Sequence, residues 1–470
     1  MTPSIAPTEK SEIDSSARCS LSLLILSSLA WLILGGGLAV VHLVQLSTPA
    51  FLADCPWLTF GHVQAMQETA LIYGWAANVG LAVALWLLSR LGATPLRGAN
   101  YVVLGWFFWN VAVASGLVAI GAGEMTSFTF LQMPAFVQTL MLVAYGVMAV
   151  PGVIAWVGRK ADSTYASQWY AMAALFLFPW FFSVAQVMLL RAPARGVIEN
   201  VIATWFAQNV LSLWLAPLAM AALYYLVPKL KGRVLSNYDF AIYGFWALLL
   251  FGSWTGGRLL VGGPVPAWIP TMAFVAGGLM LFHFIIVFVN LRGAFRPAGS
   301  TVLKFAAFGF AAYLLSGVVN LAVSSRVVSV LTQFTYFEQA QGQLSLAAFS
   351  LIMFAALYFM APRLTGAAWP SVGLIRGHYL ASILGYAVLI VALGVAGWVQ
   401  GTDLNDAKVP FEAIAPHIRP WLLTATAAQA LLVVGNLFLS VNFLCLMKTK
   451  SSVSSPALFR PALALEASAS

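Results

Sequence analysis

The stretch ALYYLVPKL, residues Ala222 to Leu230, has two related copies elsewhere in the chain. ALWLLSRL begins at Ala84 and ALYFMAPRL begins at Ala356. Each copy closes an apolar run with a basic residue followed by Leu, and the three starting positions are almost evenly spaced. Aromatic and basic residues also gather by chance at membrane interfaces. Three copies in equivalent positions nevertheless favour an internal repeat.

Composition places the chain in a membrane. Of its 470 residues, 61% are hydrophobic and only 8% are charged, whereas about a quarter of the residues in a typical soluble domain are charged. Polar segments between the apolar runs are too short for a soluble domain. Twelve runs are long enough for a spanning helix of about 20 residues, and they cover residues 20–46, 69–91, 99–122, 133–157, 167–191, 200–227, 238–257, 268–291, 302–325, 343–361, 379–400 and 420–446.

The repeat and the spans together predict the architecture. About four helices separate one copy from the next, so we expect an all-α fold with twelve transmembrane helices in three pseudo-symmetric four-helix blocks. Residues 20–447 would form this membrane domain. Residues 1–19 would form a cytoplasmic tail rather than a cleaved signal peptide, because they are acidic and lack a typical cleavage site. Residues 448–470 are predicted to be a disordered cytoplasmic tail.

The basic residues are divided unequally between the two sides of this predicted topology. The side that carries both tails holds all but six of the 23 Lys and Arg residues. The positive-inside rule therefore places both termini in the cytoplasm. It also explains the net charge of +9 without a nucleic-acid partner. The six basic residues on the other side are Arg191, Arg195, Arg258, Arg326, Lys408 and Arg419.

Cysteine and histidine show no metal-binding spacing. The cysteines are isolated and are expected to be small apolar filler: Cys19, Cys55 and Cys445. Three histidines are expected to be solvated in loops or at interfaces: His62, His378 and His417. The remaining two lie in predicted helices, each without a second histidine one turn away: His42 and His283.

Amide side chains precede each repeat by about 13 to 17 residues, roughly 20–26 Å of helix. In TWFAQNVLSLW, residues 204–214, Gln208 stands beside Asn209 in an otherwise apolar run. Gln67 has the comparable place in the second helix, and the tenth helix carries Gln339, Gln341 and Gln343. All would lie at a similar depth near the outer surface. Hydrogen bonding between helices is their simplest use, at roughly 0.6 kcal/mol per contact.

Four further stretches, in order along the chain, carry a resemblance to a known family together with the repeat-bearing helix ends. They are GHVQAMQETALIYGWAAN (61–78), GFWALLLFGSWTGG (244–257), PAW (266–268) and GHYLASILGYAVLIVALGVAGWVQG (377–401). They resemble the catalytic subunit of the cbb3-type cytochrome c oxidases, within the haem-copper oxidase superfamily. The similarity runs from about residue 60 to residue 401.

The resemblance implies two haems and a copper ion held by histidines, but this sequence departs from the family at those positions. The copper-binding histidine of the sixth helix corresponds to Gln208, and the low-spin haem histidine of the second helix corresponds to Gln67. The adjacent copper-binding pair corresponds to Arg258 and Leu259, and the tyrosine of helix seven to Gly252. The tenth-helix histidines fall in FEQAQGQL, which has none. Amides are poor substitutes for imidazole.

The resemblance and these departures together predict a cytochrome c oxidase subunit I-like protein of the bacterial inner membrane with no catalytic residue, no metal site and no cofactor. We expect it to be a structural or assembly subunit of a respiratory electron-transfer complex. Its partners would be the lipid bilayer and other subunits, such as a membrane-anchored cytochrome c. Two alternatives remain: an active oxidase with unusual haem or copper ligation, and a transporter that uses the former cofactor cavity. Scarce charges within the spans argue against the transporter.

The amides are predicted to surround one site. Gln67, Gln208 and at least one glutamine of the tenth helix should converge, with Arg258 at the outer rim. An empty cavity costs stability in proportion to its volume. Aromatic side chains, or lipid or water, are therefore expected to fill part of it, and the aromatic candidates are Trp205, Phe206 and Phe251.

The charge distribution gives a testable topology. A reporter fused after Ser470 and a reporter inserted between Asp403 and Glu412 should report opposite sides of the membrane, with the C-terminal reporter in the cytoplasm. Paired alkaline phosphatase and fluorescent-protein fusions measure this directly. A periplasmic C-terminus would mean that one predicted span does not cross.

Overall fold

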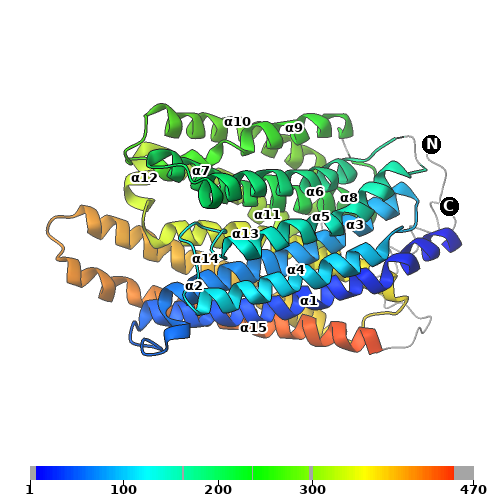
Figure 1. The fold of residues 1–470 in the computed structure, drawn as a ribbon, viewed down its shortest axis with the longest axis horizontal. Coiled ribbons are helices and arrows are strands. Elements are labelled where there is room, and N and C mark those ends of the chain that lie inside the picture. Colours follow the sequence, from blue (N-terminus) through cyan, green and yellow to red (C-terminus); the bar gives the residue numbers. More distant parts are fainter. Residues whose placement is uncertain (1–6, 161–162, 236, 296–299, 449–470) are drawn as a thin grey trace.

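The computed structural model describes residues 7–160, 163–235, 237–295 and 300–448. Within these ranges all regular secondary structure is helical, and twelve helical segments are long and apolar enough to cross a membrane. The segments lie side by side in one bundle (Figure 1). The predicted all-α fold with twelve spans is confirmed. The predicted tail 448–470 lies outside the described residues except for Lys448.

The twelve spans have the following bounds. They are α1 (Pro7–Ser47); α2 (Phe60–Thr69), η2 (Ala70–Ala76) and α3 (Ala77–Gly92); α4 (Ala99–Gly121); α5 (Ala135–Val157); α6 (Ala166–Ala185) and η3 (Gln186–Arg191); α7 (Val197–Asn209), η4 (Val210–Leu215) and α8 (Ala216–Lys231); η5 (Tyr238–Phe240), α9 (Ala241–Gly252) and η6 (Thr255–Leu260); α10 (Trp268–Leu291) and η7 (Arg292–Phe295); α11 (Thr301–Val323); α13 (Tyr336–Thr365); α14 (Val372–Asn405); and α15 (Phe411–Lys448). Two short helices lie in loops, η1 (Pro56–Leu58) and α12 (Arg326–Thr332).

The first helix begins earlier than the sequence predicted. Residues 7–19, expected in a tail, are the first turns of α1. Their polar side chains are satisfied by distant partners, which a search for apolar runs cannot detect. Asp14 is buried and forms an ion pair of 2.8 Å with Arg90 of α3, and the indole of Trp86 donates a hydrogen bond of 2.9 Å to the same carboxylate. Glu9 pairs with Lys160.

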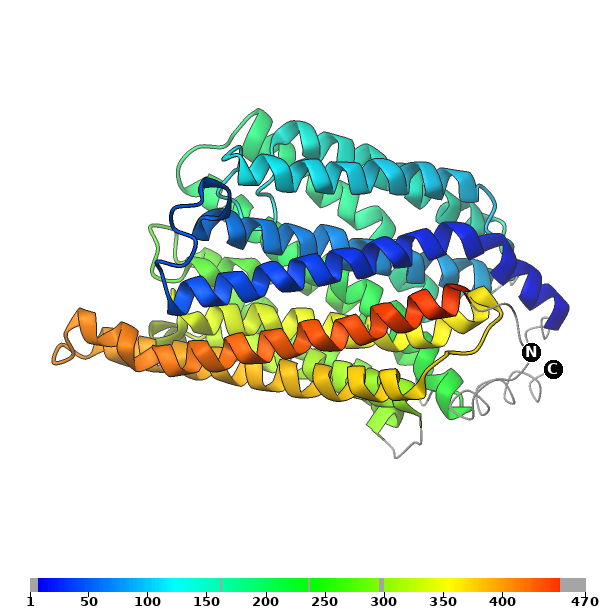
Figure 2. The same cartoon turned by 90° about the horizontal axis from the view of Figure 1, so that it is seen from below.

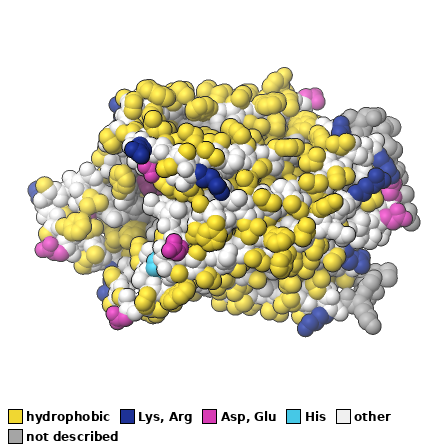
Figure 3. All heavy atoms as spheres, viewed as in Figure 1, with side chains coloured by type: hydrophobic (Ala, Val, Ile, Leu, Met, Phe, Trp, Pro, Cys, Tyr) yellow, Lys and Arg dark blue, Asp and Glu magenta, His cyan; other side chains and the backbone are white. Residues whose placement is uncertain are grey.

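The three spans that carry the repeat lie at the centre of the bundle. In their most apolar windows, 100% of the residues are buried in the span Phe60–Gly92, 94% in Val197–Lys231 and 89% in Tyr336–Thr365, against 33–50% in the other nine. The outer spans surround these three, and hydrophobic side chains cover much of the middle of the molecule (Figure 3). The repeat therefore marks the buried core rather than a surface pattern.

The repeats meet at the end of the bundle where α1 begins and α15 ends, which we call the terminal end; the other end is the distal end. There, Trp86, Tyr225 and Phe359 form a ring of edge-on contacts. The ring centroids are 5.3 Å apart for Trp86 and Tyr225, 5.8 Å for Tyr225 and Phe359, and 6.2 Å for Trp86 and Phe359. These distances match favourable aromatic pairing. We call these three residues the aromatic triad.

The distal end of α13 is held by α14. The long hairpin of α14 and α15 projects beyond the other helices at this end (Figures 1 and 2). A Cβ atom at Gly401 would lie 1.8 Å from the carbonyl oxygen of Leu331, and one at Gly397 would lie 2.0 Å from the backbone nitrogen of Phe337. Gly397 therefore lets α14 approach the start of α13, which carries the tenth-helix glutamines, and Gly401 lets α14 approach the short helix α12.

Removing one member of the aromatic triad should destabilise the bundle. Trp86→Ala would leave a core cavity and remove a hydrogen bond to buried Asp14, and large aromatic truncations in a core cost about 3–5 kcal/mol. Trp268→Ala is the matched control, because Trp268 is 63% exposed at the start of α10. Thermal unfolding in detergent, followed by tryptophan fluorescence, should show a markedly lower Tm for the first variant only. Equal Tm values would contradict a structural role for the triad.

Candidate functional site

A cavity of about 380 Å³ lies between the distal halves of the three repeat-bearing spans. Four residues that the resemblance led us to single out line it, namely Gln67, Gln208, Arg258 and Leu259. Gln339, Gln341 and Gln343 of α13 line it as well. The predicted convergence of the amides is confirmed.

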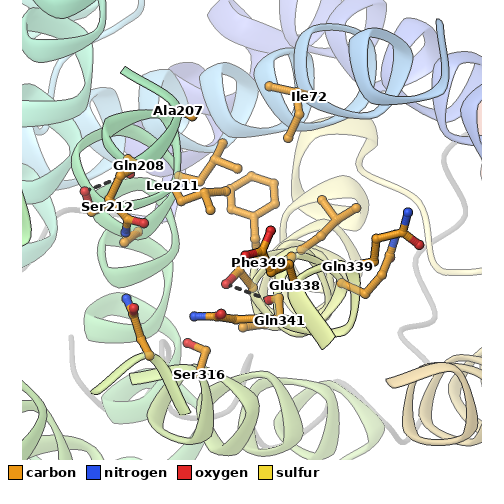
Figure 4. A pocket seen from close by; sticks show the side chains of 18 of the residues that line it. Ile72, Ala207, Gln208, Leu211, Ser212, Ser316, Glu338, Gln339, Gln341 and Phe349 are labelled. Atoms are coloured by element: carbon orange, nitrogen blue, oxygen red, sulfur yellow. Dashed lines mark hydrogen bonds between the residues drawn. The ribbon is translucent and has the colours of Figure 1, made fainter. Parts of the chain in front are cut away.

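Figure 4 shows how these side chains lie. Gln208 and Ser212 extend from the sixth span, Gln341 from α13 and Ser316 from α11, and all border the same space. Gln339 lies on the other side of α13. Apolar side chains such as Leu211 and Phe349 complete this part of the wall. The aromatic triad does not line the cavity. It holds the three repeat-bearing spans together at the terminal end of the bundle.

Two of the three central spans change helical geometry beside the cavity. The π-helical segment η2 begins three residues after Gln67, and η4 begins directly after Asn209. A π-helical turn is rare and is found frequently at functional sites. In both spans it follows the amide that faces the cavity, and this local geometry could not be read from the apolar pattern.

Arg258 reaches the cavity because η6 packs closely on α7. A Cβ atom at Gly256 would lie 2.6 Å from the carbonyl oxygen of Thr204 and 3.0 Å from the Cβ of Gln208. Only a glycine allows this approach, which places Arg258, two residues later, in the cavity wall beside Gln208. Glu338 of α13 lines the same wall, so its carboxylate and the Arg258 guanidinium are opposite charges that attract one another.

Two carboxylates that were not predicted as site residues line the cavity, those of Glu68 and Glu338. Glu68 accepts hydrogen bonds from the amide nitrogens of Gln132, at 2.5 Å, and Gln64, at 3.4 Å. Glu338 accepts a hydrogen bond of 3.3 Å from the backbone nitrogen of Phe334. Their place in the first turns of long helices was the available signal, because both helices begin earlier than the apolar runs.

Several buried polar atoms of the wall have no hydrogen-bond partner among the described residues. They are Gln67 Oε1, His42 Nδ1, Asn320 Oδ1 and Arg258 Nε. Buried polar groups in folded proteins are nearly always paired, with protein or with ordered water. The wall therefore has hydrogen-bonding capacity that the protein itself does not satisfy.

The aromatic residues expected to fill the cavity do not line it. Phe206 packs instead on Phe181 and Phe182 of α6, with ring centroids 5.8 and 6.0 Å away. Trp205 contacts Trp180 at 5.9 Å, and Phe251 is also outside the wall. That prediction was wrong because the sixth span is buried on nearly all sides, so its composition does not reveal which face turns toward the cavity.

One histidine was also misplaced. His378 is fully buried, because α14 begins before it at Val372, and its Nδ1 lies 2.9 Å from the Tyr358 hydroxyl. His417 is exposed, as predicted, and His62 is half-buried. In His283 the Nδ1 atom lies 2.7 Å from the Gly244 carbonyl oxygen, and the Nε2 atom lies 2.8 Å from the Tyr313 hydroxyl.

The donor atoms of the wall do not fit two haems and a copper ion. Copper and axial haem sites are built mainly from imidazole, thiolate or thioether donors. Among the described residues, His42 is the single imidazole in the wall, and the Tyr313 hydroxyl is engaged by His283. No group of three or more His, Cys, Asp or Glu in the described part of the chain could hold a metal ion. Amide and carboxylate oxygens dominate instead.

Fold and site together define a polytopic helical membrane protein with a polar cavity between three central, repeat-bearing spans. Residues 21–431 match the family model for cytochrome c and quinol oxidase polypeptide I. The chain therefore belongs to this family, and it is a cytochrome c oxidase subunit I-like membrane protein.

Individual relatives agree. The chain is 23% identical over 470 residues to a bacteroid cytochrome c oxidase subunit 1 homologue of Bradyrhizobium diazoefficiens, covering 92% of this chain and 83% of the relative. It is 23% identical over 390 residues to the cbb3-type cytochrome c oxidase subunit CcoN1 of Stutzerimonas stutzeri, covering 80% and 82%. A solved haem-copper terminal oxidase dimer has the same fold, with a TM-score of 0.74, 14% identity, and coverage of 93% and 86%.

Substitutions in the wall should separate paired from unpaired amides. Gln208→Leu should be nearly neutral, because its side chain makes no hydrogen bond within the described residues, and a membrane hydrogen bond contributes only about 0.6 kcal/mol. Gln132→Leu should destabilise by roughly 1.5–3 kcal/mol, because it removes a charge-assisted hydrogen bond to Glu68. Thermal unfolding of both variants, side by side, measures the difference. A larger loss for Gln208→Leu would contradict this assignment.

Proposed function

We propose that this chain is a non-catalytic subunit of a respiratory electron-transfer complex in the bacterial inner membrane, with both termini in the cytoplasm. It has the oxidase subunit I fold but binds neither haem nor copper. Its role is structural: it supplies a subunit I-shaped body against which other subunits assemble.

The side chains available as metal ligands in the central cavity are the main support for this proposal. A catalytic haem-copper site needs several imidazoles at one depth. In this chain the corresponding wall offers the amides of Gln67, Gln208 and Gln341, the carboxylates of Glu68 and Glu338, and His42. His283 is held by two hydrogen bonds of its own and lies outside the wall. Oxygen reduction at this position would lack its metal centres.

The preserved bundle supports a structural role. Loss of a cofactor normally leaves a destabilising void, yet the three central spans remain tightly packed at the terminal end. A second cluster packs the space between the fourth, fifth and sixth spans. Phe178 and Trp214 stack with ring centroids 4.0 Å apart, and the Trp214 indole donates a hydrogen bond of 3.1 Å to the Tyr145 hydroxyl. The body is therefore maintained by its own side chains.

An absorption spectrum of the purified chain tests the proposal. The expected result is no Soret band and no stoichiometric copper by elemental analysis, because the wall lacks the imidazole set. The cbb3-type subunit of Stutzerimonas stutzeri, expressed and purified in the same way, is the positive control for haem loading. Detection of about one haem per chain would overturn the proposal and make His42, with its free Nδ1, the first ligand to mutate.

A further inference from the structure

We propose that the central cavity is a binding site for an uncharged amphiphile whose head group both donates and accepts hydrogen bonds. The inference rests on the proposed function, because it requires that haem does not occupy the cavity. The proposed function leaves the cavity without haem or copper, and this inference says which class of ligand its wall would bind instead.

The size and composition of the cavity fit such a molecule. Its volume of about 380 Å³ lies within the range of roughly 300–1,000 Å³ typical of small-molecule pockets. Such pockets are mostly apolar, with a few convergent polar groups that fix orientation. Toward the middle of the bundle the wall is apolar, including Leu215, Leu248, Leu389 and Leu393. Its amides and charged groups come from the distal halves of the helices.

The unsatisfied atoms define what the head group must do. Gln67 is 7% exposed, and its Oε1 accepts no hydrogen bond within the described ranges. Asn320 Oδ1 is likewise an acceptor with no donor. Arg258 Nε is a buried donor with no acceptor. A head group must therefore offer at least one donor to the amides and one acceptor to Arg258, as hydroxyl and ester groups do.

The charges of the wall argue for an uncharged head. The Glu68 carboxylate already accepts two amide hydrogen bonds, from Gln132 and Gln64. Glu338 and Arg258 are opposite charges that attract one another. The wall atoms left without partners among the described residues are two neutral amide oxygens, the Nδ1 atom of His42 and a single guanidinium N–H. Burying a further net charge here would cost more than burying a neutral hydrogen-bonding group.

A diazirine-bearing monoacylglycerol tests the proposal, because its glycerol head donates and accepts hydrogen bonds and its acyl chain is apolar. The full chain in lipid nanodiscs is photolysed with this probe, and labelled peptides are identified by mass spectrometry. Saturable labelling of cavity peptides from α7 and α13, displaced by unlabelled 1-oleoylglycerol, supports the proposal. Oleate has the same acyl tail with an anionic head. If the site requires an uncharged head group, oleate should compete at least roughly tenfold more weakly than 1-oleoylglycerol.

Three variants and a matched control sharpen the result. Gln67→Leu and Asn320→Leu each remove an acceptor and should weaken the apparent Kd for the probe by roughly tenfold, as expected for one buried hydrogen bond. Gln208→Trp fills the cavity and should abolish saturable labelling. Asn200→Leu is the control, because Asn200 lies on the same helix but is exposed and outside the wall, and it should leave labelling unchanged.

The outcomes separate this proposal from the function on which it rests. Each sample's absorption spectrum is recorded before photolysis, and size-exclusion chromatography confirms that each variant is folded. No haem and no saturable labelling would overturn the amphiphile site alone, as would labelling unchanged by Gln208→Trp. A Soret band with no labelling would overturn the proposed function and this inference together.

Discussion

The contact of Trp86, Tyr225 and Phe359 is the constraint from which the rest of the architecture follows. Each residue comes from one copy of the repeat, so three distant segments are fixed against one another at a single point. The same cluster is tied to α1, because the Trp86 indole and the Arg90 guanidinium both bind Asp14. Once the three spans are joined at the terminal end, their opposite halves must face one another. The cavity forms there because the facing side chains are amides and aliphatic groups that do not fill the space.

The sequence was sufficient for the features that depend on long apolar runs and on spacing. Twelve spans follow from hydropathy, and the similar depth of Gln67 and Gln208 follows from the similar distance of each from its repeat. The sequence could not place Phe206 or Trp205, because a span buried on nearly all sides has no polar face to orient it. It also missed residues 7–19 of α1 and the burial of His378, since both depend on partners far away in the chain: Arg90 for Asp14, and Tyr358 for His378.

In the cavity wall, charged side chains and neutral amides differ in whether they have partners within the protein. Charged groups are matched within the protein, as Glu68 is by Gln132 and Glu338 is by Arg258. Neutral groups such as Gln67 Oε1 and Asn320 Oδ1 are not matched. This division is physically reasonable, because an unmatched buried charge costs far more than an unmatched amide. It also leaves the Glu68 carboxylate with hydrogen-bond donors from the protein whether or not the cavity is occupied.

The placement of these charges at one end of the bundle has an electrical consequence. Glu338 is the third residue of α13, Arg258 lies near the end of η6, and Glu68 is within the first ten residues of its span. Moving one elementary charge across a whole membrane exchanges about 2.3 kcal/mol per 100 mV of potential. Groups close to one surface cross only a small part of that field. The membrane voltage therefore changes the energy of the ionisable groups of this wall only slightly. Occupancy of the cavity by its ligand should be the same in energised and de-energised membranes.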